Sequence, residues 1–124
     1  MGESRAQGIG GVFFRSADPA ALAAWYAEHL GLAIEEWGGS VLGAEAGDVT
    51  VWSPFPADTD YWPAGQQAMV NCRVRDLDAL LARLREAGVE VDKRGIEETE
   101  QGRFAWAVDP EGNRFELWQP PSGS

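Results

Sequence analysis

The sequence predicts an α+β domain built from two tandem βαβββ modules, and three observations support this prediction. The 124 residues are 44% hydrophobic and 24% charged, a composition that suits one compact domain with a buried core. In each half of the chain, a short apolar segment with strand character precedes a segment whose leucines and alanines have helical spacing. Landmarks of the first half recur in the same order in the second half, which indicates an internal duplication. We therefore treat residues 1–124 as one domain.

The first module is predicted to span residues 8–52. Residues 9–16 (IGGVFFRS) are apolar and rich in β-formers, so a strand is expected there. A helix begins at Asp18-Pro19, because aspartate caps a helix N-terminus and proline fits the first turn, and it ends at Gly31. Three further strands, separated by turn-forming Gly38-Gly39 and Gly47-Asp48, are expected at 32–37, 40–45 and 48–52.

The second module, residues 68–120, repeats this pattern after a proline-rich linker at 53–67. A strand at 69–75 is followed by a helix that Asp76 caps and Gly88 ends. The remaining segments are a short strand at 89–92, an acidic loop at 93–101, and a hairpin of 103–108 and 114–118 joined by DPEGN.

Counting along the chain aligns the two modules. Arg15 and Arg73 lie 58 residues apart, as do Asp18 and Asp76. The closing strands, VTVW at 49–52 and FELW at 115–118, are offset by 66, and the acidic loop accounts for the extra residues. Agreement among separate landmarks supports duplication rather than chance similarity.

Charge and composition predict a cytoplasmic protein that binds neither nucleic acid nor membrane. With 20 acidic and 10 basic residues the net charge is −10, which disfavours contact with phosphate backbones. No apolar run approaches the roughly 18 residues of a membrane span, and the first residues lack the pattern of a secretory signal. The single cysteine, Cys72, excludes an internal disulfide and is predicted to be buried.

Three segments, AWYAEHLGL at 24–32, VRDLDALLARLREAGVEV at 74–91 and VDPEGNRFELWQP at 108–120, carry a family resemblance. With them the chain resembles the vicinal oxygen chelate superfamily, which includes glyoxalase I, bleomycin-resistance proteins and extradiol dioxygenases. The resemblance extends over residues 9–120. It implies that the paired modules curl into a half-open curved sheet whose concave face holds a ligand, and it favours a homodimer.

The resemblance also implies four metal-ligand positions, in the first and closing strands of each module. In this chain they carry Gly11, Thr50, Met69 and Glu116. Only Glu116 suits a hard or borderline divalent cation, which needs several N or O donors. The only histidine, His29, falls in the last turn of the first helix, where we expect it to be solvated. We therefore predict a protein without a metal or other cofactor.

Strand alternation predicts which side chains face the concave side, because apolar members of each strand face the helices. The expected ligand-binding residues are Phe13, Arg15, Trp52, Asn71, Arg73, Arg114 and Trp118. Trp52 and Trp118 occupy equivalent positions and are expected to form walls for a flat or cationic ligand. The parity of strand 103–108 is ambiguous. Phe104 and Trp106 therefore remain unassigned. The roles of Trp37 and Trp62 are also left open, between a dimer contact and the mouth of the pocket.

Glu116, the candidate catalytic residue, has two interpretations. In the first it serves as a general base whose pKa apolar neighbours raise, with an arginine as its electrostatic partner. In the second, which we favour, it forms an ion pair with an arginine across the sheet.

The sequence favours a bleomycin-resistance-like protein that sequesters a small organic ligand in an aromatic pocket, which is what the resemblance implies for a small, acidic member without metal ligands. Whether it catalyses any reaction is left open. The alternatives are a metal-independent lyase or isomerase using Glu116, a metal-dependent glyoxalase or dioxygenase with unusual ligands, and a structural dimerisation module whose concave face is filled.

Overall fold

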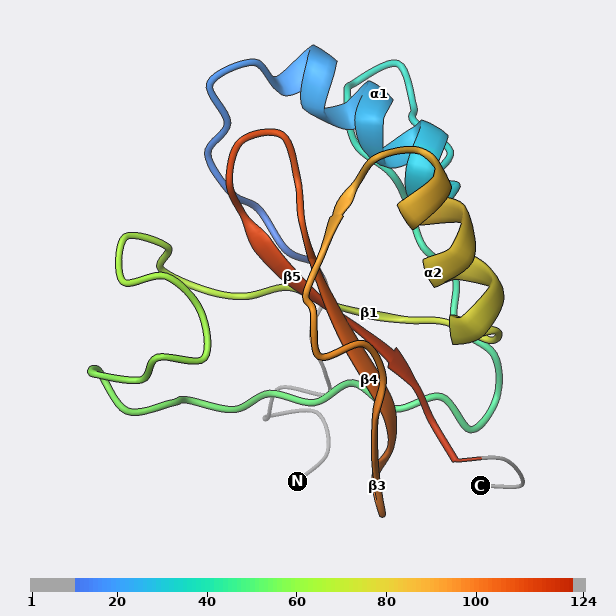
Figure 1. The fold of residues 1–124 in the computed structure, drawn as a ribbon. Helices are drawn as coiled ribbons and strands as arrows, with labels where there is room; N and C mark the ends of the chain where they lie inside the picture. Colours follow the sequence, from blue (N-terminus) through green and yellow to red (C-terminus); the bar gives the residue numbers. More distant parts are fainter. Residues whose placement is uncertain (1–10, 122–124) are drawn as a thin grey trace, which may run out of the picture.

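The structure, a computed structural model, describes residues 11–121 and places two helices over one face of a curved, unclosed sheet (Figure 1). The elements follow one another as α1 (Pro19–Leu30), β1 (Asn71–Arg73), α2 (Leu77–Glu86), β2 (Glu90–Val91), β3 (Glu97–Thr99), β4 (Gly102–Val108) and β5 (Arg114–Gln119). This arrangement confirms the predicted α+β fold class.

The sheet has the order β1-β5-β4-β2, and β3 pairs with the other end of β4. The edge strand β1 runs parallel to β5, whereas the other pairs are antiparallel. The helix α2 connects β1 to β2 and lies over the sheet. All strands of the sheet lie within the second predicted module.

Both helices begin where the sequence predicts. The side chains of Asp18 and Asp76 each accept a hydrogen bond of 3.1 Å from a backbone N–H in the first turn, which satisfies a donor that the helix itself leaves unpaired. Pro19 occupies the first turn of α1, and Gly31 ends that helix with a left-handed φ of 74°. Local sequence therefore fixes the start of both helices and the end of α1. Helix α2 ends at Glu86, two residues before the predicted Gly88, which adopts a left-handed φ of 81°.

The hydrophobic core lies between α2 and the face of the sheet that it covers. Leu77, Leu81 and Leu84 repeat at helical spacing, and each is at most 1% exposed. They form one cluster with Phe115 and Leu117, which alternate along β5. Two alanines of β4 complete the cluster, Ala105 and Ala107. The alternation predicted for β5 is confirmed, and the side chains between these residues occupy the concave face.

Helix α1 is held against the second module by the turn between β4 and β5. The hydroxyl of Tyr26 donates to Asp109 at 2.8 Å, and burial, with this bond, raises the pKa of Tyr26. Trp25 contacts Phe115 edge to face, with ring centroids 6.1 Å apart. Glu111 accepts hydrogen bonds from the backbone N–H of Ala17, from the Ser16 hydroxyl and from the backbone N–H of Asp18, and these bonds lower the pKa of its carboxyl.

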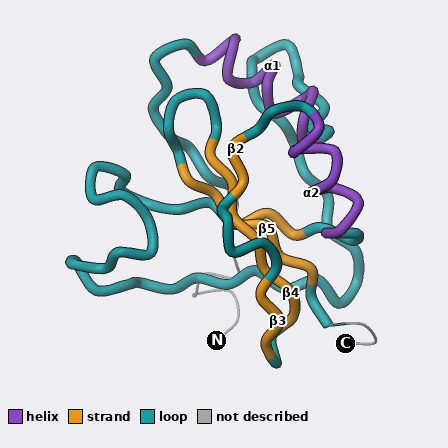
Figure 2. Tube along the Cα trace, viewed as in Figure 1, coloured by secondary structure: helices purple, strands orange, loops and turns teal. Residues whose placement is uncertain are grey.

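The strands predicted in the first module are not formed in the described part of the chain, where residues 31–52 are loops (Figure 2). The strand predictions at 32–37, 40–45 and 48–52 are wrong, and so is the one at 9–16 over its described residues, 11–16. Residues 9 and 10 lie outside the described range. The turns between them are present, since Gly38 and Gly47 adopt positive φ values of 101° and 92°. A strand needs a neighbour to satisfy its backbone groups, and no described residue supplies one to these segments.

Two smaller differences concern the second module. The strand expected at 69–75 is shorter, since β1 covers only Asn71–Arg73. The segment 93–101, predicted to be a loop, contains β3, because the N-terminal end of β4 extends beyond β2 and offers an edge for pairing. Cys72 packs against the core as predicted, and burial raises the pKa of its thiol to about 11. No helix within residues 11–121 is long and apolar enough to cross a membrane.

Candidate functional site

Glu116 lies at the centre of the concave face and is 8% exposed. Its Oε2 accepts hydrogen bonds from the Tyr61 hydroxyl at 2.5 Å and from the Trp106 indole N–H at 2.9 Å. Its Oε1 accepts one from the Asn71 amide at 2.7 Å. All three donors are neutral. The expected ion pair is wrong, since no arginine among the described residues lies within ion-pair distance of this carboxylate.

Sheet register brings these groups together. Asn71 of β1 and Trp106 of β4 are the residues directly opposite Glu116 on its two sides. Directly opposite residues on neighbouring strands point to the same face, so both side chains reach the carboxylate. The inward position predicted for Asn71 is thus confirmed, and Trp106, left unassigned by its sequence, belongs to the concave face.

The third donor comes from the linker, which crosses the sheet on the side away from the helices (Figure 1). The Tyr61 ring stacks on Phe55, with centroids 5.6 Å apart, and meets Trp106 edge to face at 6.0 Å. The linker is anchored by Gln66, whose side chain bonds both the N–H and the C=O of Arg114, at 2.9 and 2.7 Å. The Gln66 side chain therefore makes the backbone hydrogen bonds that a neighbouring strand would make at the start of β5.

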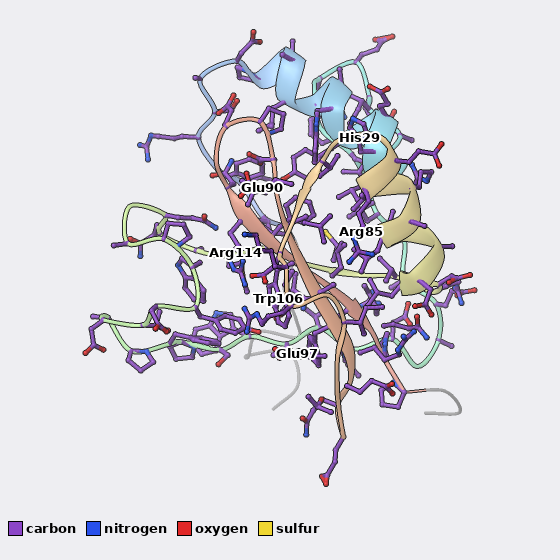
Figure 3. The ribbon with its side chains drawn as sticks, in the orientation of Figure 1. His29, Arg85, Glu90, Glu97, Trp106 and Arg114 are labelled. Carbon is purple, nitrogen blue, oxygen red and sulfur yellow. The ribbon has the colours of Figure 1, made fainter. Side chains whose placement is uncertain are left out.

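Two arginines lie beside the aromatic rings. Arg94 places its guanidinium 4.3 Å from the Trp106 ring centroid, and Arg114 lies 5.4 Å from it (Figure 3). Asp92 accepts from both guanidinium groups, with 2.9 Å to Arg114 and 3.4 Å to Arg94. The backbone N–H of Arg94, followed by these guanidinium groups, lowers the pKa of Asp92 to about 2. The cationic groups therefore have an ionised partner at neutral pH.

A cleft of about 640 Å³ opens between the linker and the end of the sheet. Its lining combines aromatic, acidic and basic side chains: Thr59, Asp60, Tyr61, Trp62, Pro63, Ala64, Asp92, Arg94 and Arg114. Trp62, also left unassigned by its sequence, donates to the backbone of Gln66 at 3.0 Å and belongs to this lining. A cleft of this size, walled by rings and guanidinium groups, can accommodate a flat organic molecule.

The structure brings only some of the predicted site residues together. Asn71 bonds Glu116, and Arg114, two residues before Glu116 in β5, donates to the Tyr61 carbonyl. Phe13 and Trp52 are instead 93% and 75% exposed. The others lie elsewhere: Arg15 is exposed, Arg73 bonds the backbone of Val49 and pairs with Asp48, and Trp118 stacks on Phe104 with centroids 6.2 Å apart. The pair of tryptophan walls is therefore not assembled in the single chain.

The residues at the four metal-ligand positions do not fit a divalent cation. Gly11 and Thr50 are exposed, Met69 offers only a thioether, and the oxygens of Glu116 are taken by neutral donors. No group of three or more His, Cys, Asp or Glu side chains suited to a metal occurs in the described range. The expectation that His29 is solvated is wrong, because its side chain is 14% exposed and its ring lies 4.8 Å from that of Trp25.

Three residues of the site are not predicted from the sequence: Tyr61, Asp92 and Arg94. Tyr61 belongs to a linker that the sequence treats as a connection, and its density of aromatic residues was the available signal. Asp92 and Arg94 were part of a region interpreted as a strand end and acidic loop. Their role depends on the turn after β2, where Asp92 accepts from the backbone N–H of Arg94 at 2.9 Å.

The Tyr61 hydroxyl provides a pH-dependent test of this geometry. Burial, and then the hydrogen bond to Glu116, raises the pKa of Tyr61 from 10.0 to about 12. The folded state thus holds this proton more tightly, so the stabilisation is complete below pH 10 and is lost as the pH rises towards 12. The free energy of unfolding, measured with urea at several pH values across this range, should fall less steeply with pH for Tyr61→Phe than for the wild type. Since the pKa of Tyr26 is also raised, some decline should remain; identical slopes would contradict the Tyr61–Glu116 bond.

Comparison with known proteins places the chain in a family. The sequence model described as "Glyoxalase-like domain" matches residues 11–118. A search of curated proteins finds no match. The solved structure of TnmS3, described as an antibiotic binding protein from Streptomyces sp. CB03234, is 30% identical, with 85% of this chain and 88% of that chain covered and a TM-score of 0.55.

Two more distant structures show the same fold. A member of the glyoxalase/bleomycin resistance protein/dioxygenase superfamily from Sphaerobacter thermophilus is 22% identical over 84% of this chain and 90% of its own, with a TM-score of 0.51. A domain of that description from Frankia sp. EAN1pec is 20% identical over 90% and 88%, also with a TM-score of 0.51. With a family match over residues 11–118 and a 30%-identical relative, the chain belongs to the glyoxalase-like family of the vicinal oxygen chelate superfamily.

Proposed function

We propose that this protein binds a flat organic molecule of the antibiotic type on its concave face and sequesters it in the cytoplasm without a metal. The observation that carries the proposal is the cleft of about 640 Å³, walled by Tyr61, Trp62 and two arginines, beside a carboxylate bonded only to neutral groups. The relation to TnmS3, described as an antibiotic binding protein, supports the same ligand class.

Sequestration needs affinity but no chemistry. Aromatic and guanidinium faces stack on a planar ligand, while the few polar groups fix its orientation. A protein present in excess over its ligand lowers the free ligand concentration by mass action, and the native state gains stability in proportion to occupancy.

The direct test is a thermal-shift screen with planar aromatic antibiotics, followed by mass spectrometry of the recovered compound. We expect a ligand-dependent rise in Tm and an unmodified compound after prolonged incubation. Conversion of the compound, abolished by Glu116→Gln, would instead support the lyase or isomerase alternative. Retention of one equivalent of metal on purification would contradict the metal-free site.

The enzyme alternative is less well supported by the site. A general base needs a lone pair directed at the substrate, whereas the Glu116 oxygens accept from Tyr61, Asn71 and Trp106. The structural alternative predicts a filled concave face. Tyr61 fills the part above Glu116, yet the cleft beside it remains.

We further propose that the first module, residues 8–52, completes its strands in a homodimer. In a single chain its apolar side chains are exposed: Val12, Phe13, Phe14, Val41, Leu42, Val49, Val51 and Trp52 are 57–93% exposed. Large exposed apolar surface on a protein commonly marks a site of protein association. A second copy of the chain offers the same unpaired segments, so two copies can satisfy both backbone and apolar groups.

Light scattering after gel filtration tests this association. The wild type is expected at twice 13.5 kDa, and Phe13→Asp should shift the population towards the monomer because a charge replaces a ring in the contact. Ala82→Asp, on the exposed side of α2, is the matched control and should remain dimeric. A monomeric wild type at micromolar concentration would contradict the proposal.

A further inference from the structure

The position of Tyr61 is unusual for a linker residue, because its side chain occupies the concave face of the sheet. Its hydroxyl meets Glu116 at 2.5 Å, and its ring lies among Phe55, Trp62 and Trp106, at centroid distances of 5.6, 6.2 and 6.0 Å. The phenol therefore has a stacking partner, two edge contacts and an anionic acceptor. These are the interactions that a pocket offers to an aromatic ligand.

The carboxylate determines what can occupy this position. Glu116 is 8% exposed, and Asn71 and Trp106 supply two of its three hydrogen bonds from the sheet itself. Only the third donor, the Tyr61 hydroxyl, comes from outside the sheet. Loss of a hydrogen-bond donor to a buried carboxylate is destabilising, so any group that replaces Tyr61 must also donate a hydrogen bond to Glu116. An ionised phenol is excluded by charge repulsion.

The linker that carries Tyr61 is attached to the sheet by a small set of polar contacts. Besides the phenol, these are the Tyr61 carbonyl, which accepts from Arg114 at 3.0 Å, and the Gln66 side chain on the Arg114 backbone. The other bonds of the linker are local, such as that from Trp62 to Gln66. Tyr61 itself lines the cleft of about 640 Å³, so open space lies next to its side chain.

We propose that Tyr61 acts as an internal stand-in for a ligand, and that the concave site takes an aromatic molecule with a neutral phenolic hydroxyl that replaces Tyr61 on Glu116. The exchange is nearly balanced, since one phenol replaces another on the same acceptor and between the same rings. The site favours phenols over arenes that lack only the hydroxyl, because only a phenol donates the third hydrogen bond to Glu116. This inference rests on the proposed function and specifies the ligand class of that site.

The test uses 4-methylphenol, which reproduces the tyrosine side chain, and toluene, which lacks only the hydroxyl. Tyr61→Ala vacates the position, and calorimetric titration at neutral pH should show it binding 4-methylphenol at least about tenfold more tightly than the wild type does. Toluene should bind the same variant about tenfold more weakly than 4-methylphenol, because it leaves the carboxylate without its third donor.

Matched variants exclude indirect effects. Tyr26→Phe alters the other tyrosine, which donates to Asp109 on the helix side, and should bind 4-methylphenol no better than the wild type. Tyr61→Phe keeps the ring but not the donor, so it should bind 4-methylphenol more tightly than the wild type even if Tyr61→Ala fails to fold. Equal affinity of wild type and Tyr61→Phe, or equal binding of phenol and toluene to Tyr61→Ala, would overturn the inference.

The experiment separates this inference from the broader proposal. Antibiotic binding by the wild type with no phenol preference in the Tyr61 variants would retain sequestration and reject the stand-in role. Phenol rescue of Tyr61→Ala without binding of any larger compound by the wild type would retain the stand-in role and reject sequestration.

Discussion

Asp109→Ala is expected to lower the free energy of unfolding by about 3 kcal/mol, although Asp109 lies at a surface turn. The residue is 4% exposed and accepts from the Tyr26 hydroxyl at 2.8 Å and from the backbone N–H groups of Glu111 and Asn113 at 2.9 and 3.0 Å. Alanine leaves these donors unpaired and detaches α1 from the β4–β5 turn. Urea unfolding monitored by circular dichroism measures the change.

Two variants define the cause of that loss. Asp109→Asn keeps one acceptor oxygen, so it should lose less stability than alanine. Asp78→Ala removes an exposed carboxylate that pairs with Arg103 at 2.9 Å, and should cost much less stability than Asp109→Ala because water screens the pair. Equal losses at Asp78 and Asp109 would contradict the assigned role of the turn.

The DPEGN segment thus has a structural explanation. Asp109 organises the turn and holds Tyr26, Gly112 adopts the positive φ of 86° that the turn requires, and Glu111 holds the chain entering α1. In the sequence, this segment carries part of the family resemblance. Its chemistry instead fastens the helix of one module to the hairpin of the other.

The helices and the closing hairpin were predictable because their signals are local. A capping aspartate, leucines at helical spacing and a turn with proline and glycine determine structure within a few residues. The face to which each β5 side chain points was also predictable, because Phe115 and Leu117 alternate with polar Glu116. Such alternation identifies the buried face without knowledge of neighbours.

The absence of strands in the described part of the first module could not be predicted by the same reasoning. Alternation in 48–52 indicates which side chains would share a face, but not whether another strand lies beside them. Backbone pairing is a long-range property, and here no described segment of the same chain supplies it. The exposure of Val51 and Trp52, at 70% and 75%, is the consequence.

The aromatic residues of the site could not be predicted from the sequence, for two different reasons. Strand 103–108 has apolar residues on both faces, so its pattern does not distinguish the alanines under α2 from Phe104 and Trp106 on the concave side. Tyr61 lies 55 positions from Glu116, in a linker without regular structure. No periodicity predicts such a contact, which depends on how the linker folds back.

Trp106→Ala is expected to cause a loss of about 4 kcal/mol in the free energy of unfolding and to abolish ligand binding on the concave face. The side chain is 1% exposed, donates to Glu116 at 2.9 Å, contacts the Tyr61 ring and carries the guanidinium of Arg94 on its face. Alanine creates a cavity and leaves the buried carboxylate without one donor. Urea unfolding and ligand titration measure the two effects.

Comparison with Trp106→Phe separates packing from hydrogen bonding. Phenylalanine preserves most of the ring but not the N–H, so its loss should be nearer 1–2 kcal/mol, the cost of one missing donor to a buried charge. Trp37→Ala, at a site that is 68% exposed, should leave the stability of the chain within about 0.5 kcal/mol. If Trp106→Phe is as damaging as alanine, the indole N–H dominates; if it is neutral, packing alone explains Trp106, and the hydrogen bond to Glu116 adds nothing to stability.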